Sequence, residues 1–204
     1  MRVHIDEGAR AGGRDATQLD IACRIMVAID NAGAERPNEY LPTYDEKHKY
    51  GGKADLFAKM LFEEIKPMID REFRTKPEAK NTAFVGSSYG GVLALHLGLT
   101  NSSKLGKIGV VSPSLDWDDD VMIRSIDALT TKLPVKIWLD AGTQEWSKMV
   151  SYMEKAADAL ESKGWKKGKD LMVYVDGWAV HNEAAWARRL PVILLYLFAR
   201  KGVF

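Results

Sequence analysis

A serine flanked by glycines follows a short apolar run and precedes a stretch of small residues. The run Asn81–Gly86 (NTAFVG) has the composition of a strand and leads into GSSYG (residues 86–90), which contains Gly-x-Ser-x-Gly. A serine on a sharp strand-to-helix turn exposes its hydroxyl, and the glycines permit the turn without Cβ clashes. The pattern predicts Ser88 as a nucleophile and the Tyr89 backbone N–H as an oxyanion donor at a helix N-terminus. The alternative is a glycine-rich turn that binds phosphate or no ligand.

A serine hydroxyl is a weak nucleophile and needs a base, for which the chain offers four histidines. His181 follows the last apolar run and precedes a helical pattern, which is where the base lies in hydrolases built around this serine turn. His4 and His48 fall in irregular segments typical of the surface, and His96 falls inside the apolar stretch after the serine. His181 is therefore the predicted base; without a partner it would simply be a residue near a helix N-terminus.

Two carboxylates follow the strand-like run Val135–Asp140 closely enough to orient that histidine. An acid beyond the end of such a strand can accept the proton on the second ring nitrogen, fix the tautomer and stabilise the imidazolium. Glu145 is preferred, and Asp140 is the alternative, although a residue at a strand end can also cap a turn. Asp176 is third because it ends the last strand itself. The order serine, acid, histidine along the chain is that of the α/β-hydrolases.

Five apolar runs rich in β-forming residues predict the strands that would position these side chains. Because they lack strict alternation, they are typical of strands buried on both faces of a parallel sheet. The runs are RIMVAID (24–30), NTAFVG (81–86), KIGVVS (107–112), VKIWLD (135–140) and LMVYVD (171–176).

Helical patterns separate these runs, and strand–helix alternation indicates an α/β fold with a mostly parallel sheet flanked by helices. Pro67 is expected to kink or divide the first helix, and Pro191 is a candidate break in the last one. The stretch 31–52 is long, irregular and expected to be functional or mobile. The helical patterns cover residues 55–73, 90–99, 147–162 and 182–200.

Composition and charge narrow the class of protein. The 204 residues fit one domain over residues 1–204, with an irregular segment at 1–23. A formal net charge of +1 argues against nucleic acid or an anionic membrane as a partner. With neither an 18-residue apolar run nor a visible signal peptide, a membrane span is not expected and a cytoplasmic location is the default. The single cysteine, Cys23, cannot form an internal disulfide and is expected to be buried.

From Ile29 onward the sequence resembles the Putative esterase family, which groups esterase D-like, enterochelin esterase-like and feruloyl esterase-like α/β-hydrolases. This resemblance implies hydrolysis of carboxylic esters through an acyl-enzyme, without a cofactor or metal. The implied substrates are short acyl esters, including acetyl or feruloyl esters, as small molecules or on polysaccharide. The segments that carry the resemblance are IDNAGAERPNEYLP (29–42), AFVGSSYGGVLALHLGL (83–99), KIGVVSPSLDWDD (107–119), IWLDAGTQE (137–145) and HNEAAWARRLP (181–191).

By position, the resemblance matches Ser88 and His181 to the nucleophile and base of the family, and Glu145 falls where the acid, often an aspartate, follows a Gly-Thr turn. It also implies that the loops 31–40 and 112–117 border the active site. The side chains in these loops that would contact substrate, or else stabilise the loops, are Arg36, Tyr40 and Trp117.

The sequence departs from the family at its beginning. Members usually have further strands there, one of them ending in a His-Asp-Gly-like turn that donates the second oxyanion N–H. We find no such segment before Ile29, so an N-terminally reduced fold is expected, with Asp30–Gly33 as one source of the second donor. Acyl transfer to an alcohol and a catalytically silent binding domain are the alternative functions. A homodimer that pairs an uncovered N-terminal edge strand is a further expectation.

Overall fold

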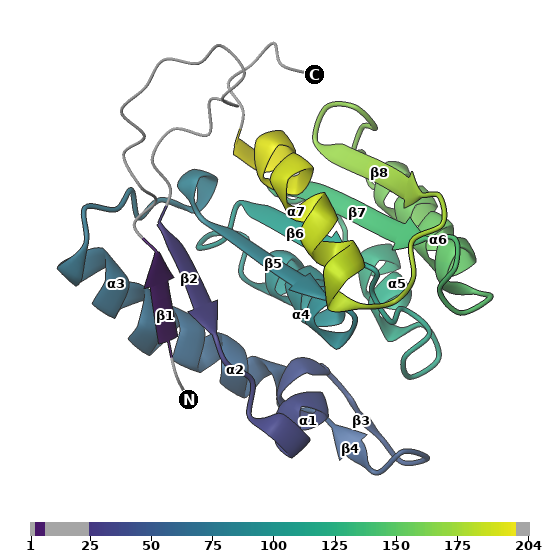
Figure 1. The fold of residues 1–204 in the computed structure, drawn as a ribbon, viewed down its shortest axis with the longest axis horizontal. Helices are drawn as coiled ribbons and strands as arrows, with labels where there is room; N and C mark the ends of the chain where they lie inside the picture. Colours follow the sequence, from purple (N-terminus) through teal and green to yellow (C-terminus); the bar gives the residue numbers. More distant parts are fainter. Residues whose placement is uncertain (1–2, 7–24, 199–204) are drawn as a thin grey trace.

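The computed structural model describes residues 3–6 and 25–198, which are built around a parallel four-stranded sheet (Figure 1). The strand order is β5–β6–β7–β8. In the register, Ser87 pairs with Val111 and Val111 pairs with Asp140, so the carboxyl ends of three strands meet at one edge. The strands are β5 (Ala83–Ser87), β6 (Lys107–Val111), β7 (Lys136–Gly142) and β8 (Leu171–Asp176), each within two residues of its predicted run.

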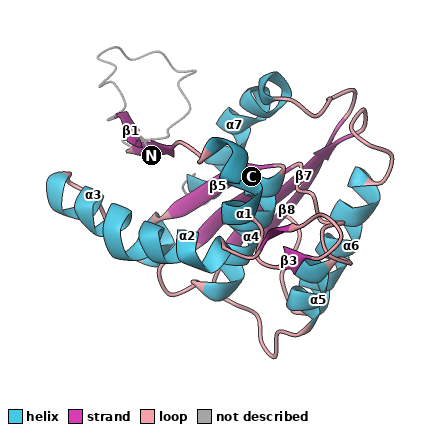
Figure 2. Ribbon diagram, turned by 90° about the horizontal axis from the view of Figure 1, so that it is seen from below, coloured by secondary structure: helices cyan, strands magenta, loops and turns pink. Residues whose placement is uncertain are grey.

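Helices cover both faces of this sheet, as Figure 2 shows. Ile108 and Val110 of β6 belong to the large core cluster that includes residues of α4, α5 and α6, whereas Val111 packs in a second cluster with Ile193 of α7. Burial on two faces explains why these runs are continuously apolar. The helices are α4 (Tyr89–Thr100), α5 (Val121–Asp127), α6 (Met149–Ser162) and α7 (Glu183–Phe198); α5 was not predicted.

The two prolines within predicted helices behave differently. The first helical pattern is divided into α2 (Ala54–Met60), a π-helical turn (Leu61–Ile65) and α3 (Lys66–Glu72). Pro67 stands in the first turn of α3, where its missing N–H is tolerated, so the predicted division is confirmed. The candidate break at Pro191 is wrong, because α7 continues through it. Buried residues beyond Pro191, such as Ile193, hold the last turns against the sheet.

The N-terminal strands lie outside the parallel sheet. β1 (Val3–Asp6) pairs antiparallel with β2 (Met26–Ile29), so the expectation of irregular structure throughout 1–23 is wrong for these four residues, among them His4. The residues of β2 alternate between exposed and half-buried, which corrects the prediction of a strand buried on both faces. A two-stranded antiparallel pair leaves one face to solvent. Cys23 and the rest of 7–24 lie outside the described residues.

The stretch 31–52, predicted to be irregular, contains short elements instead. A 3-10 turn (Gly33–Glu35) leads into α1 (Arg36–Tyr40), and β3 (Tyr44–Asp45) pairs with β4 (Tyr50–Gly51). Elements of two to five residues are too short for periodicity to reveal. Between residues 25 and 198, none of the helices is long and apolar enough to cross a membrane.

Candidate active site

Ser88 stands at the turn between β5 and α4 in a conformation that serine rarely adopts. Its φ is 58° and its ψ is −122°, and its N–H donates to the Val111 carbonyl at 3.0 Å. A Cβ on Gly86 would lie 2.1 Å from the Gly90 carbonyl oxygen, so the chain can cross itself here only with glycine at position 86. A backbone of this kind costs on the order of 1–3 kcal/mol and is typical of functional sites. This is the strained strand-to-helix turn that the motif predicts.

His181 lies on the loop after β8, and its ring is held from three sides. Its Nδ1 is 2.9 Å from Oε2 of Glu145. The ring also packs edge-on against Trp186, with ring centroids 4.8 Å apart, and beside Trp146 at 4.6 Å. A bond at Nδ1 leaves Nε2 as the atom that can exchange a proton with another group.

The side chain of Glu145 is buried, and each of its oxygens has a partner. Oε1 accepts hydrogen bonds from the Ser112 hydroxyl at 2.6 Å and from the Gly142 N–H at 2.8 Å, while Oε2 faces His181. Burial by itself raises the pKa of the Glu145 carboxyl, but the bonds to His181, Ser112 and Gly142 outweigh it and leave the pKa below its usual value. Glu145 is therefore held as a carboxylate.

The other two carboxylates considered as the acid, Asp140 and Asp176, are bound by Arg189 instead of His181. Asp140 accepts bonds from Nε and Nη2 of Arg189 at 3.1 and 3.0 Å and from the Trp138 ring N–H at 2.7 Å. Asp176 accepts from Nη1 of Arg189 at 3.1 Å. Burial raises the pKa of Asp140, and the Arg189 charge offsets part of that effect. Of the three carboxylates, Glu145 is the one that the structure brings to His181.

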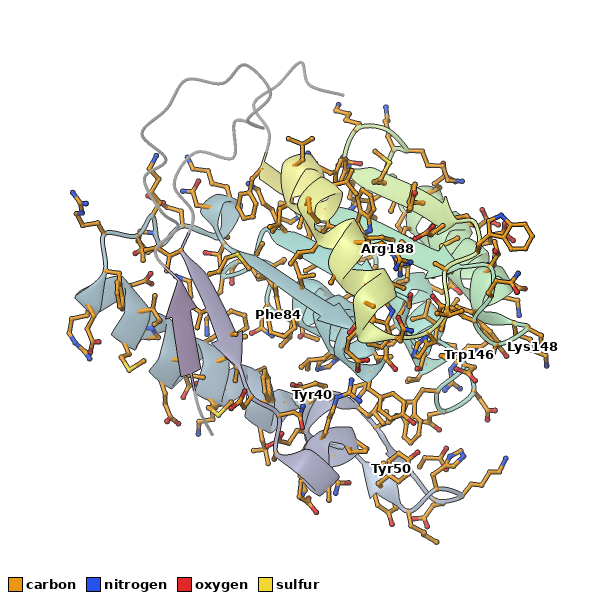
Figure 3. All side chains as sticks on the ribbon, in the orientation of Figure 1. Tyr40, Tyr50, Phe84, Trp146, Lys148 and Arg188 are labelled. Carbon is orange, nitrogen blue, oxygen red and sulfur yellow. The ribbon has the colours of Figure 1, made fainter. Side chains whose placement is uncertain are left out.

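A cavity of about 540 Å³ opens beside Ser88. Its wall combines aromatic rings with aspartates: Tyr50 stacks on Trp117 with ring centroids 5.2 Å apart, and the hydroxyls of Tyr50 and Tyr89 are 3.1 Å apart. Burial and the bond to Tyr50 raise the pKa of Tyr89 to about 12, so this hydroxyl stays neutral. Figure 3 labels Tyr50 and Trp146, which reach the cavity from separate segments. The lining comprises Asp45, Lys47, His48, Tyr50, Ser88, Tyr89, Ser114, Asp116, Trp117, Asp118, Asp119 and Trp146.

The three residues predicted to contact substrate are placed differently. Trp117 lines the cavity, and its ring N–H donates to Thr43 at 3.2 Å. Arg36 donates to the Ser87 carbonyl at 3.3 Å, and its guanidinium lies over the rings of Tyr40 and Tyr89. Tyr40, labelled in Figure 3, packs edge-on against Phe57 beneath the serine turn. Arg36 and Tyr40 thus brace the turn from the side of α1, and neither is among the described residues that line the cavity.

Sequence reasoning missed several residues of the cavity wall. His48 is exposed, as predicted, but its ring also lines the cavity, with Nδ1 2.9 Å from Asp45 and the ring centroid 5.5 Å from that of Trp117. Trp146 directly follows Glu145, the predicted acid, so its position in the sequence could have indicated that it lies near the active site. The aromatic residues within 44–50 could likewise have indicated a cavity wall. No group of three metal-ligating side chains is found among the residues with described positions.

In the loop Asp30–Gly33, predicted as a source of the second oxyanion donor, two backbone N–H groups already have hydrogen-bond acceptors. The N–H of Ala32 donates to Glu39 at 3.2 Å, and the N–H of Gly33 donates to the Asn31 side chain at 2.9 Å. Because both N–H groups donate to side chains within residues 31–39, they are not available to a ligand in this conformation.

Comparison with known proteins identifies the family to which this chain belongs. The model of the Putative esterase family matches residues 8–197. The uncharacterized protein YbbA of Bacillus subtilis is 22% identical over 186 residues, which are 86% of this chain and 74% of that protein. The siderophore enterobactin esterase of Emericella nidulans is 31% identical over 78 residues, which are 38% of this chain and 26% of that protein.

Solved structures share the fold at low sequence identity. The BES protein of Bacillus cereus superposes with a TM-score of 0.72 at 20% identity, over 88% of this chain and 71% of that chain. The enterobactin esterase FES of Shigella flexneri superposes with a TM-score of 0.68 at 19% identity, over 86% of this chain and 44% of that chain. The chain thus spans less than half the length of FES. With the family model matching nearly its whole length, this chain belongs to the Putative esterase family of carboxylesterases with an α/β-hydrolase-type fold.

Proposed function

We propose that this carboxylesterase works through an acyl-enzyme on Ser88, with His181 as the base and Glu145 as the acid that orients it. The observation that carries the proposal is the His181–Glu145 pair, at the same sheet edge as the strained Ser88 turn. Because Nδ1 is engaged by Glu145, Nε2 is the atom that would take the serine proton.

The reaction would proceed in two halves. Ser88 Oγ attacks the ester carbonyl while His181 takes its proton, and the Tyr89 N–H donates to the developing oxyanion. His181 then protonates the leaving alcohol, and water activated by the same ring releases the acid. Ser88 and His181 share no hydrogen bond among the described side chains; in unliganded hydrolases such bonds are often long and tighten once substrate binds.

We propose an aromatic acyl group, such as feruloyl, as the preferred substrate alongside short acyl groups such as acetyl. Tyr50, Tyr89, Trp117 and Trp146 line the cavity next to Ser88, and aromatic rings pack well on one another. One structural relative is a ferulic acid esterase, with a TM-score of 0.59 at 15% identity over 70% of this chain and 60% of that chain, whereas several others are enterobactin esterases. The ester would be a small molecule or carried on a glycan.

Hydrolysis of p-nitrophenyl acetate through octanoate, and of methyl ferulate, by the wild type and Ser88→Ala tests the proposal. We expect turnover by the wild type and loss of it in Ser88→Ala, while Ser125→Ala, which removes a hydroxyl from α5, retains it. Equal rates for the wild type and Ser88→Ala would show that Ser88 is not the nucleophile.

A binding domain without turnover is the second candidate, favoured by the engagement of the Ala32 and Gly33 N–H groups within their own loop. Lacking one oxyanion donor costs about 100-fold to 1,000-fold in kcat. A stoichiometric burst of p-nitrophenol followed by slow turnover would mark a weak enzyme. Binding of methyl ferulate without any burst would favour the binding domain.

A further inference from the structure

Arg189 of α7 is buried, at 3% exposure, in a network that ends on Glu145. Two of its nitrogens hold Asp140, a third holds Asp176, and Nη2 also donates to the Ser112 hydroxyl at 2.7 Å. A buried guanidinium is costly unless its donors are satisfied, and these two carboxylates supply the opposite charge. They therefore fix Arg189 in one place.

Ser112 joins this network to Glu145, and the direction of its bonds is settled by chemistry. Its hydroxyl lies 2.7 Å from Arg189 Nη2 and 2.6 Å from Glu145 Oε1. Arginine can only donate, so Ser112 accepts from Arg189 and its one proton points to the Glu145 carboxylate. Ser112 is fully buried with a φ of 41°, a left-handed backbone that is uncommon for serine.

We infer that Ser112 and Arg189 are positioning residues, which lock Glu145 so that Oε2 faces His181 Nδ1. The inference rests on the proposed function, in which Glu145 orients His181. Ser112 and the Gly142 N–H both engage Oε1, so rotation of the carboxylate would break two bonds at once. Arg189 Nη2 is also 3.9 Å from Oε1, which adds a favourable charge.

The network matters most in the transition state, when His181 carries a positive charge. A fixed, ionised Glu145 stabilises that charge without having to move. Loss of the Ser112 hydroxyl would leave an Arg189 N–H unsatisfied in a buried place, and Oε1 of Glu145 would keep its bond from the Gly142 N–H but lose the one from Ser112. With one of the two bonds at Oε1 lost, the Glu145 carboxylate would turn more easily toward Arg189, away from His181. Asp140, weighed as a catalytic acid, contributes by holding Arg189.

The test is a double-mutant cycle of Ser112→Ala and Glu145→Gln, with ester hydrolysis as the readout. Losing a hydrogen bond to a charged group typically costs about 10-fold to 100-fold. We expect Ser112→Ala to lower kcat by about that factor with KM nearly unchanged, but to have less than about a twofold effect when Glu145→Gln is already present. Equal losses in both backgrounds would show a general structural role and overturn the inference. Ser125→Ala is the control for removing a hydrogen-bonded, partly buried serine hydroxyl away from the site.

A proton NMR measurement reports on the hydrogen bond between His181 and Glu145 without the need for turnover. The far-downfield resonance of the His181 Nδ1–H is expected in the wild type and in Ser125→Ala, and it should shift or vanish in Ser112→Ala. An unchanged resonance in Ser112→Ala would overturn the inference. If Glu145→Gln leaves ester hydrolysis intact, the proposed triad fails, and the resonance still decides whether Ser112 holds Glu145.

Discussion

His181 and Glu145 are 36 positions apart in the sequence, yet Nδ1 and Oε2 are joined at 2.9 Å. The two residues come from the loops that follow β8 and β7, and these strands are neighbours in the sheet. Their pairing is thus a consequence of strand order. It also places the histidine on the edge where the Ser88 turn emerges from β5.

Glu145→Gln should lower kcat for p-nitrophenyl acetate by about 10,000-fold, the size of the effect when a triad acid becomes an amide and the histidine takes the wrong tautomer. Glu183→Gln changes an exposed carboxylate two residues from His181 and should keep wild-type kcat. A loss smaller than tenfold in Glu145→Gln would mean that another group orients His181.

Ser88→Ala and Ser88→Gly should both abolish hydrolysis but differ in stability. At a φ of 58° a Cβ is strained, whereas glycine adopts this backbone freely. We expect Ser88→Gly to have a free energy of unfolding about 1 kcal/mol above that of Ser88→Ala, after the entropic cost of glycine in the unfolded chain. Urea denaturation of both variants measures the difference. A less stable Ser88→Gly would contradict the idea that the turn stores strain.

The parallel sheet and the placement of Ser88 were predictable because their signals are local. A continuous apolar run predicts a strand buried on two faces, and the glycine-flanked serine follows such a run directly. The same reasoning failed for β2, whose apolar run forms a half-exposed strand beside β1. Local composition does not reveal which strand will pair with which.

The environment of Glu145 was not predictable, because it depends on contacts between distant segments. Ser112 and Arg189 are 77 positions apart and meet only when α7 packs against the sheet. The sequence ranked Glu145 and Asp140 by position alone. In the structure, Glu145 is paired with His181, whereas Asp140 is paired with Arg189. His48 is exposed, as predicted, but nothing local in the sequence showed that its side chain would line the Ser88 cavity.

The stabilising effect of Glu145 should depend on pH. Its pKa in the folded chain lies below the usual 4.5, so the carboxylate stabilises the fold above about pH 4.5, and that stabilisation is lost as the pH falls through the folded value. The free energy of unfolding should therefore be higher for the wild type than for Glu145→Gln at pH 7, and the gap should narrow below pH 4.5. Urea titrations of both proteins from neutral to acid pH measure it. A gap that stays constant in acid would show that the hydrogen bonds do not favour the ionised form.

The two outer glycines of GSSYG should differ sharply when changed to alanine. A Cβ at Gly86 would lie 2.1 Å from the Gly90 carbonyl oxygen, and backbone atoms cannot yield by that much. A Cβ at Gly90 would meet only the Tyr40 ring, at 3.8 Å, which is ordinary contact. We expect Gly86→Ala to unfold many degrees below the wild type or to fail to fold, and Gly90→Ala to melt close to it, because alanine suits a helical position. Thermal unfolding monitored by circular dichroism compares the two. Equal melting temperatures would contradict the close approach of Gly86 to the Gly90 carbonyl at the Ser88 turn.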